Sequence, residues 1–438
     1  MDFLTLDNLA RKLNKQKEPG NHTVFARVDT NTTLIEGTFG ANDRIRCAGV
    51  TIKRLVDMGL KVVIGTHNGR RGDPDFVSLA PLREMLSVIV GPIEYIGNTY
   101  DDDGINQEAI QRINILGPRE AFLLENLRFL PHETEKRTPE DHSRSRFIQQ
   151  LVNDCHVEYY VNDAFSTCHR NHRSIVGFGE IPNFAGLTTE AELKSANSVF
   201  AQFSAKQSNR QNIFVLGGVK IQDYFELMEN SLAEKKVDKI LCAGAFGNLC
   251  LFARGNELGE ASKKFLVTHK LWDLRPRLRD LMKQYPNVFE VPVDIATIQN
   301  EQRREYAMDS IPQEVQQKYQ ALDIGERTAE KFSNIIDNAK LVFVKGPIGA
   351  FDKSGLLAKG CFLILRKIAD RDFSARCFTV LAGGDTSVML AALEVDRTAI
   401  NHVSLAGGAL LKLYAGEELP GLIQLEKSYQ KFGNSFLR

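Results

Sequence analysis

The chain has 438 residues, of which 43% are hydrophobic and 25% charged, and its 55 Lys and Arg residues balance 55 Asp and Glu residues. This length is too great for one hydrophobic core and predicts two domains, and the composition is that of a soluble globular protein. The zero net charge argues against a nucleic-acid-binding protein, because neutralising phosphates needs a surplus of cations.

The chain also lacks the usual signals for export or membrane insertion. Its first residues do not show the basic and apolar regions of a signal peptide, and its longest apolar stretch, 240–253, is too short to span a membrane. The seven cysteines are an odd number without a Cys-x-x-Cys pair, which favours a reducing cytoplasm over a disulfide framework.

Short β-branched runs alternate with helical patterns along the first half. We predict strands at 24–28, 61–65, 93–96, 121–124 and 158–161. After the first strand, apolar residues such as Ile45 and Ile52 recur on a helical period, with Asn42 as a plausible N-cap and Gly59 as the stop. A boundary between domains is expected near 186–194, where Thr189 and Glu192 have capping-box spacing and predict a helix through Phe200 that joins the halves.

The second half repeats the alternation, with strands predicted at 213–216, 240–242, 341–344, 378–381 and 403–405. Fully apolar strands alternating with helices predict an α/β fold whose parallel sheets are covered by helices on both faces. Ligands of such sheets bind at the carboxyl ends of the strands. Residues 256–335 are charged and weakly patterned, and we predict little function there.

Cationic side chains follow the strands of the first half within a few residues: Arg44, His67, Arg70, Arg128 and Arg170. A guanidinium group pairs in two-pronged fashion with phosphate or carboxylate, so the set predicts a cleft for a small, multiply charged anion. Any one of them alone could equally be a solvated loop cation. Asp29 and Asn31 could fix a ligand hydroxyl or could simply form a turn. For His67 we favour an anion contact over a general base or a metal ligand.

Glycine pairs follow the strands of the second half. Gly217 and Gly218 precede Lys220, and Gly383 and Gly384 precede Asp385 and Thr386. Bare backbone leading into a helix suits the phosphates of a nucleotide, although a tight β–α turn is an equal interpretation of the first pair. In the second we expect Asp385 or Thr386 to cap the next helix, or Asp385 to help hold Mg²⁺; a capped helix without a ligand is the alternative. No P-loop or dinucleotide motif occurs.

Taken in order, these residues resemble the phosphoglycerate kinase family, and the archaeal members most. The resemblance runs from about Arg27 to Gly421. Its segments are Arg27-Val-Asp-Thr-Asn, Asn42-Asp-Arg-Ile-Arg, Thr66-His-Asn-Gly-Arg, Leu124-Glu-Asn-Leu-Arg-Phe, Val161-Asn-Asp-Ala-Phe-Ser-Thr-Cys-His-Arg, Leu216-Gly-Gly-Val-Lys, Asp323-Ile-Gly, Gly346-Pro-Ile-Gly-Ala-Phe, Gly383-Gly-Asp-Thr and Gly407-Gly408 followed by Gly416-Glu-Glu-Leu-Pro.

The resemblance implies two Rossmann-like domains joined by a helical hinge, and reversible phosphoryl transfer between ATP and the carboxylate of 3-phosphoglycerate. It implies a phosphoglycerate-binding domain at 1–188, on which a C-terminal tail at 415–438 packs, and a nucleotide-binding domain at 189–414. It further implies a cytoplasmic, monomeric enzyme that uses Mg²⁺ with ATP or ADP and that closes a cleft during the reaction.

By match with the family, each site residue takes an expected role. Arg44, Lys220 and Gly384 would be catalytic, and Asp385 would serve the metal. The acceptor would be held by Asp29, Asn31, Arg44, His67, Arg70, Arg128 and Arg170. The nucleotide would be held by Gly217, Gly218, Lys220, Gly346, Pro347, Asp352, Gly383, Gly384, Asp385 and Thr386.

Departures from the family pattern lie mainly in the second half. Tyr224 stands where many members have a second lysine, and Lys345 replaces an asparagine. Asp352 replaces a glutamate, Ala382 replaces a glycine, and Leu405-Ala406 replaces a Thr-Gly pair. Two alternatives therefore stay open: a regulatory paralogue that binds phosphoglycerate without transferring a phosphoryl group, and a kinase for a related carboxylate.

Overall fold

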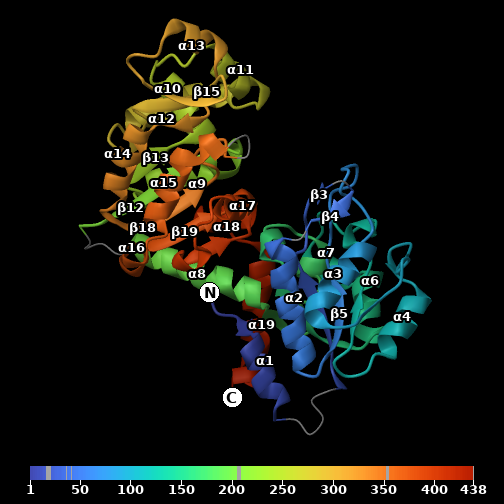
Figure 1. Ribbon diagram of the computed structural model, residues 1–438. Helices are drawn as coiled ribbons and strands as arrows, with labels where there is room; N and C mark the ends of the chain where they lie inside the picture. Colours follow the sequence, from blue (N-terminus) through green and yellow to red (C-terminus); the bar gives the residue numbers. More distant parts are fainter. Residues whose placement is uncertain (16–20, 36, 41, 205–208, 352–354, 438) are drawn as a thin grey trace. The chain divides into compact units, whose positions relative to one another are not determined.

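The computed structural model describes residues 1–15, 21–35, 37–40, 42–204, 209–351 and 355–437, and in these ranges the chain divides into two compact units (Figure 1). Unit 1 comprises Met1–Lys194 and Glu417–Arg438, and unit 2 comprises Ser195–Gly416. The helix α8 (Leu187–Ser204) runs across the boundary. Among the described helices, none combines the length and the apolar character needed to cross a membrane.

Unit 1 is built on a parallel sheet with the strand order β1-β11-β10-β2-β5-β9-β6. The strands predicted in the first half are confirmed to within a few residues. The sheet comprises β1 (Leu4–Thr5), β2 (Thr23–Val28), β5 (Lys61–Gly65), β6 (Ile93–Tyr95), β9 (Ala121–Leu123), β10 (Val157–Asp163) and β11 (Asn183–Ala185). Two short hairpins accompany it, β3 (Leu34–Ile35) with β4 (Thr38–Phe39) and β7 (Tyr100–Asp101) with β8 (Gly104–Ile105).

Helices cover both faces of this sheet, as the apolar strands predict. Along β2, Val24 and Ala26 join one hydrophobic cluster and Phe25 joins another on the opposite face. The helices of unit 1 are α1 (Leu6–Leu13), α2 (Asp43–Asp57), α3 (Ala80–Val90), α4 (Gln107–Asn114), α5 (Pro139–Ser143), α6 (Arg146–Gln149), α7 (Arg173–Val176) and α19 (Pro420–Leu437). The last of these returns from the far end of the chain: Phe436 enters the core beside Phe184, with ring centroids 5.1 Å apart.

Unit 2 contains a second parallel sheet, with the order β14-β13-β12-β18-β19-β20. The five strands predicted in this half are confirmed, with small shifts at their ends. They are β12 (Gln211–Leu216), β13 (Lys239–Cys242), β18 (Ala339–Lys345), β19 (Phe378–Ala382) and β20 (His402–Ser404), joined by β14 (Phe289–Glu290). The helices are α9 (Gln222–Ala233), α10 (Gly244–Ala253), α11 (Glu260–Thr268), α12 (Arg275–Gln284), α13 (Gln313–Lys318), α14 (Glu326–Ile336), α15 (Lys359–Ile368), α16 (Arg371–Arg376), α17 (Gly384–Ala392) and α18 (Gly407–Tyr414).

Unit 2 also holds an antiparallel sheet that the sequence pattern does not predict. Its strands are β15 (Asp294–Gln299), β16 (Gln302–Ala307) and β17 (Asp323–Ile324), in the order β16-β15-β17. Arg303 on β16 pairs with Asp323 on β17, with Nη1 2.8 Å from Oδ2. The weakly patterned segment 256–335 is therefore an organised part of unit 2.

The starts of helices α2 and α8 test our predictions of capping. Helix α2 begins as predicted, because Asn42 Oδ1 accepts from the backbone N–H of Ile45 at 2.9 Å. The prediction that a capping box at Thr189 opens helix α8 is wrong. The helix begins at Leu187 and ends at Ser204, beyond Phe200. Its first turn is capped by Asp163 from the end of β10, whose Oδ1 accepts from Thr188 N at 2.7 Å and Thr189 N at 3.1 Å.

Candidate functional site

In unit 1, polar side chains gather at the carboxyl ends of β2, β5 and β10. Arg27 lies at the centre of this cluster and is 1% exposed. It donates to Ser174 Oγ at 2.9 Å, to Nδ1 of His67 at 3.0 Å, and to the carbonyl of Val28. Sequence analysis did not assign Arg27 to the site, because a strand residue in an apolar run is expected to be structural.

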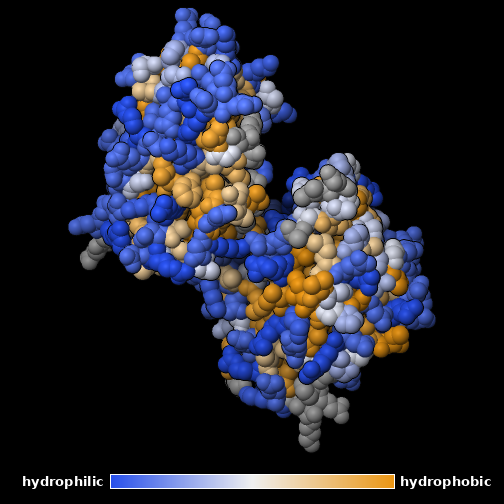
Figure 2. Space-filling view, in the orientation of Figure 1, coloured by the Kyte–Doolittle hydropathy of each residue, from blue (hydrophilic) through white to orange (hydrophobic). Residues whose placement is uncertain are grey.

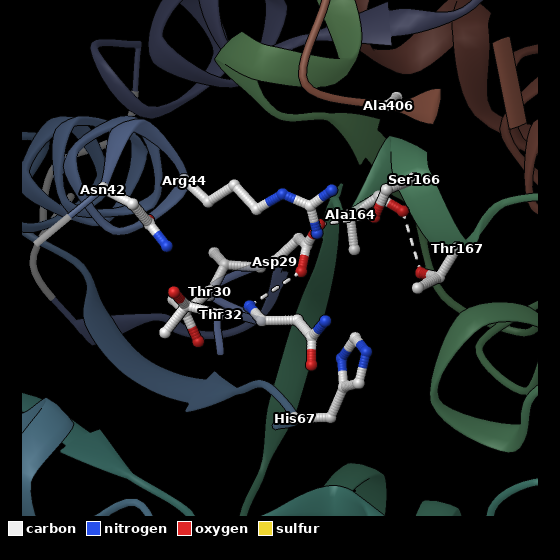
Figure 3. A network of polar contacts seen from close by, with 12 residues as sticks. Asp29, Thr30, Thr32, Asn42, Arg44, His67, Ala164, Ser166, Thr167 and Ala406 are labelled. Carbon is white, nitrogen blue, oxygen red and sulfur yellow. Dashed lines mark hydrogen bonds and ion pairs between the residues drawn. The ribbon is translucent and has the colours of Figure 1, made fainter. Parts of the chain in front are cut away.

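Asp29 and Asn31 form the loop that follows β2. Figure 3 shows the Arg44 guanidinium directed at the Asp29 carboxylate, and Nη1 of Arg44 lies 2.8 Å from Oδ2 of Asp29. Oδ1 of Asp29 accepts from the backbone N–H of Asn31 at 3.0 Å, and Oδ1 of Asn31 accepts from Gly69 N at 2.9 Å. The turn interpretation therefore holds for both residues, and this turn also fixes Arg44 and the loop that carries Arg70.

His67 is a neutral hydrogen-bonding group in this structure, whereas the sequence grouped it with the cations. Burial, followed by the charges of Arg27 and Arg128, lowers the pKa of His67 well below 6.5. Because Nδ1 faces an Arg27 nitrogen that can only donate, Nδ1 is the acceptor and Nε2 carries the proton. The ring therefore offers one N–H donor without adding a positive charge.

The remaining predicted cations of unit 1 meet at one cavity of 480 Å³. It is lined by Arg70, Arg71, Arg128, Leu130, Pro131, Thr134, Arg170 and His172. Burial, with the charge of Arg170 next, lowers the pKa of Arg128 to about 10, so it stays protonated at neutral pH. The four guanidinium groups around this cavity repel one another, and a multiply charged anion would relieve that repulsion.

Behind these cations lies a buried carboxylate that sequence analysis also missed. Oε1 of Glu133 accepts from Ser174 Oγ at 2.6 Å, and its Oε2 accepts from Ser174 N at 3.1 Å. Burial raises the pKa of Glu133, against the opposing charge of Arg27. Glu133 and Arg27 both hold Ser174, so they fix the short helix α7, which begins directly after His172.

In unit 2, two glycine-containing loops meet at the ends of β12 and β18. Gly217 N donates to Lys345 O and Gly218 N donates to Pro347 O, both at 2.8 Å. A Cβ atom on Gly217 would lie 2.2 Å from Pro347 O, and one on Gly346 would lie 2.3 Å from Gly217 O. Gly217 and Gly346 are thus required for the packing of one loop on the other, whereas Gly218 and Pro347 line the adjoining cavity.

This second cavity has a volume of 490 Å³ and combines backbone with apolar side chains. It is lined by Gly218, Val219, Lys220, Gly244, Ala245, Asn248, Phe265, His269, Gln320, Ala321, Leu322, Pro347, Gly349, Ala350, Phe351 and Val388. In Figure 2, apolar residues of unit 2 gather on the face that carries α9 and α17. The segment 256–335, for which we predict little function, contributes five residues to the lining: Phe265, His269, Gln320, Ala321 and Leu322.

Helix α17 brings the Gly383-Gly384 motif to the ends of β18 and β19. Its N-cap is Gly383, at φ 111°, so the expectation that Asp385 or Thr386 caps it is wrong. A Cβ atom on Gly384 would meet open space, so bare backbone is accessible there. The side chains of Asp385 and Thr386, and the whole of Asp352, lie outside the described residues.

Tyr224, which replaces an expected lysine, belongs to the packing of unit 2. It is 1% exposed and its hydroxyl donates to Gly217 O at 3.1 Å. Burial raises the pKa of Tyr224 well above 10, so it carries no charge. Through this hydrogen bond, Tyr224 holds the loop at Gly217 in place.

A polycationic cavity on one parallel α/β unit and a glycine-lined cavity on another define a class of protein, the two-domain α/β phosphotransferases. The family model for phosphoglycerate kinase matches residues 15–417. Phosphoglycerate kinases of Pyrococcus horikoshii and Thermococcus kodakarensis are each 33% identical to this chain, covering 94% of it and 96% of their own length. The chain therefore belongs to the phosphoglycerate kinase family.

Solved structures agree with this assignment. The crystal structure of the Pyrococcus horikoshii OT3 enzyme matches with a TM-score of 0.83 and 33% identity over 94% of this chain and 98% of that one. A phosphoglycerate kinase from Coxiella burnetii, 23% identical, shares the fold with a TM-score of 0.70 over 97% of this chain and 99% of that one. The comparisons support the ATP-dependent kinase expected from the sequence, and they support neither the regulatory paralogue nor the kinase for another carboxylate.

Proposed function

We propose that the chain transfers a phosphoryl group reversibly between ATP and 3-phosphoglycerate, with unit 1 binding the acceptor and unit 2 binding the nucleotide. The main support for this division of roles between the two units is the contrast between their cavities. Guanidinium groups surround the first, whereas glycine backbone, Lys220 and apolar side chains surround the second. Guanidinium suits phosphate and carboxylate, and a largely apolar pocket with a few polar groups suits a nucleoside.

The acceptor would be oriented by two groups of residues in unit 1. Arg70, Arg128 and Arg170 would bind its phosphate, since they line one cavity. Arg44, held by Asp29, would bind the reacting carboxylate, and the neutral His67 would donate from Nε2. The side-chain oxygen of Asn31 would hold Gly69 in place, and the side-chain nitrogen of Asn31 would contact the ligand.

In the reaction, a carboxylate oxygen forms a bond to the γ-phosphorus as the bond from that phosphorus to the β–γ bridging oxygen breaks. The electron pair stays on the departing ADP. The carboxylate is already ionised, so no proton is transferred, and catalysis depends on positioning and on fixed positive charge. Arg44 and Lys220 would supply this charge, and the N–H groups at Gly383 and Gly384 would bind phosphate oxygens. Gly218 and Pro347 would contact the nucleotide.

Mg²⁺ would accompany the nucleotide in this scheme. Among the described residues, no three His, Cys, Asp or Glu side chains gather into a metal site. This fits an ion that takes most of its ligands from nucleotide phosphates and water and only one or two from carboxylates. Asp385, in the first turn of α17, is the proposed protein ligand. The bound ion would neutralise charge on the phosphates.

A coupled assay of ADP formation with 3-phosphoglycerate and several nucleoside triphosphates tests the function. We expect turnover with ATP, and we expect Arg44→Ala or Lys220→Ala to lower kcat by about 10²–10³-fold with the fold intact. Arg46→Ala is the matched control, because Arg46 lies on the same helix, pairs with Asp43 at 3.1 Å and is 58% exposed. Near-normal turnover in both site variants would contradict the assigned roles.

We also propose that the enzyme acts as a monomer in the cytoplasm, in contact with small-molecule substrates and with neither nucleic acid nor membrane. The balanced charge of the chain supports this. Sedimentation at micromolar concentration should give the mass of a single 49.1 kDa chain, and a dimer mass would contradict the proposal.

A further inference from the structure

The cavity of unit 1 is lined by one arginine that the match with the family does not assign to the site. Arg71 lines it together with Arg70, Arg128 and Arg170. Within the described part of the chain, none of these four guanidinium groups forms an ion pair with a carboxylate. Arg71 therefore adds a further positive charge to the place where the acceptor phosphate is proposed to bind.

The carboxylates near this cavity do not balance its cations. Burial, followed by the charge of Arg70, lowers the pKa of Arg170, and Asp29, which already pairs with Arg44, opposes this only in part. A phosphate monoester brings roughly 1.5 to 2 negative charges at pH 7. The four guanidinium groups thus offer more positive charge than one phosphate brings.

Arg71 lies in a β-turn whose shape does not depend on its side chain. Asp73 N donates to Arg70 O at 2.8 Å, and Gly72 has a φ of 94°, whereas Arg71 is not among the residues with positive φ. These values define a type II turn, in which glycine suits the third position and proline the second. The second position is occupied here by Arg71, so an arginine stands where the backbone alone would favour proline.

The residue before this turn, Gly69, attaches it to the rest of the site. Asn31 Oδ1 accepts from Gly69 N at 2.9 Å, and the Arg128 guanidinium donates to Gly69 O. A Cβ atom on Gly69 would lie 2.3 Å from the backbone nitrogen of Phe76, so the loop packs directly against the chain there. The backbone of Arg71 is thus held beside the cavity, and its exposed guanidinium is available to a ligand.

We infer that Arg71 is a further acceptor-binding residue, whose guanidinium binds the phosphate of the acceptor from the turn after β5. The inference rests on the proposed function of unit 1 and adds a residue to the proposed set. A further guanidinium gives the phosphate an additional charge-assisted donor. The reacting carboxylate binds at the other end of the acceptor, at Arg44, so Arg71 contributes to affinity and not to the transfer step.

The test compares Arg71→Pro, which removes the guanidinium and keeps the turn, with the wild-type protein. We expect the KM for 3-phosphoglycerate to rise about 3- to 10-fold, because a charge-assisted hydrogen bond at an exposed position is lost. The value of kcat should not change. The increase of KM with salt should be smaller than in the wild type, since one charge fewer attracts the acceptor. Arg71→Lys, which keeps the charge without the two-pronged geometry, should recover part of the affinity.

Thermal unfolding separates a role in binding from a role in the turn. Without ligand, Arg71→Pro should unfold at the same or a higher temperature than the wild type, because proline fits this position and restricts the unfolded chain. With equal 3-phosphoglycerate added to both proteins, its upward shift should be the smaller one. Arg71→Ala serves if the proline variant does not fold. A lower unfolding temperature with an unchanged KM would assign Arg71 to the turn and overturn the inference.

The matched control is Arg83→Ala, which changes the net charge of the chain by the same amount. Arg83 lies on α3 of the same unit, pairs with Glu84 at 3.3 Å and does not line the cavity. This variant should keep the KM of the wild type and its dependence on salt. If Arg71→Pro and Arg71→Ala also keep them while the wild type is active, the inference about Arg71 is wrong and the proposed function stands. If the wild type forms no ADP from 3-phosphoglycerate and ATP, the proposed function fails instead.

Discussion

At the scale of single residues, the environment of His67 changes what its sequence position suggests. A histidine after a strand, among arginines, is expected to be a cation that binds an anion. The structure instead encloses it beside Arg27, so that the charged form is disfavoured. The sequence could not show this, because Arg27 reaches His67 only through the pairing of β2 with β5.

We predict that His67 contributes a hydrogen bond and no titrating charge. His67→Ala should raise the KM for 3-phosphoglycerate about 10- to 100-fold, whereas His67→Gln should keep part of the affinity, since its amide can donate. The ratio of kcat/KM between wild type and His67→Gln should stay constant from pH 6 to 8. This ratio cancels the titration of the substrate phosphate itself. A cationic His67 would make the ratio fall as the pH rises through 6.5.

The site residues differ in how far the sequence could place them. Strand ends of a parallel sheet share one edge, so Arg70, Arg128 and Arg170 could be brought together from the pattern alone. Glu133 and Ser174 could not, because nothing in their spacing shows that they hold each other. The packing role of Gly217 and Gly346 was also invisible, since it depends on two loops 129 residues apart.

At the scale of elements, five strands of each parallel sheet were predictable because each is a short apolar run followed by a turn. The strands β1, β11 and β14, only two or three residues long, were not predicted. The antiparallel strands β15 and β16 were also not predicted. Polar residues dilute the apolar pattern of both, since β15 buries Asp294 and Thr297 and β16 is mostly polar and only partly buried. The start of α8 shows a second limit. A capping box is a local signal, but the cap that forms comes from Asp163, at the end of a strand in another part of the sequence.

We predict that Asp163 stabilises the start of α8 and, with it, the connection between the units. Asp163→Ala should lower the free energy of unfolding by about 1–2 kcal/mol, as the loss of an N-cap does. Asp163→Asn is the control, because its remaining oxygen can still accept from Thr188 N and Thr189 N. Equal stability of the alanine variant and the wild type in denaturant unfolding would contradict this role.

The stability of the protein should also depend on pH through Asp163. Burial raises the pKa of Asp163 to about 6, above the roughly 3.9 expected in the unfolded chain. The folded protein thus holds a proton that the unfolded chain has lost, so the contribution of Asp163 to stability decreases as the pH rises from about 4 to about 6. Asp163→Asn lacks this titration and should gain stability relative to the wild type over that window.

At the scale of the whole molecule, the zero net charge conceals a strongly uneven distribution. The cavity of unit 1 is surrounded by four arginines, Arg70, Arg71, Arg128 and Arg170, although cations and anions balance over the chain. Such a local field raises the concentration of an anionic ligand at its site without making the protein a general polyanion binder. Composition alone therefore argues against a nucleic-acid-binding protein, but it does not reveal this local cluster of cations.

Division of the two substrates between two units has a consequence for the motion of the chain. The acceptor carboxylate and the γ-phosphate must come into contact for transfer, and water must be kept from the phosphoryl group. If unit 1 binds one substrate and unit 2 the other, the segments that join the units, α8 and the return near Gly416, govern how the two substrates approach each other. We therefore predict that 3-phosphoglycerate together with MgADP, a pair that cannot react, lowers the radius of gyration in small-angle scattering. Either ligand alone should leave it unchanged, and Arg44→Ala should weaken the response because it loosens the acceptor. An unchanged radius with both ligands at saturation would show that transfer does not depend on closure.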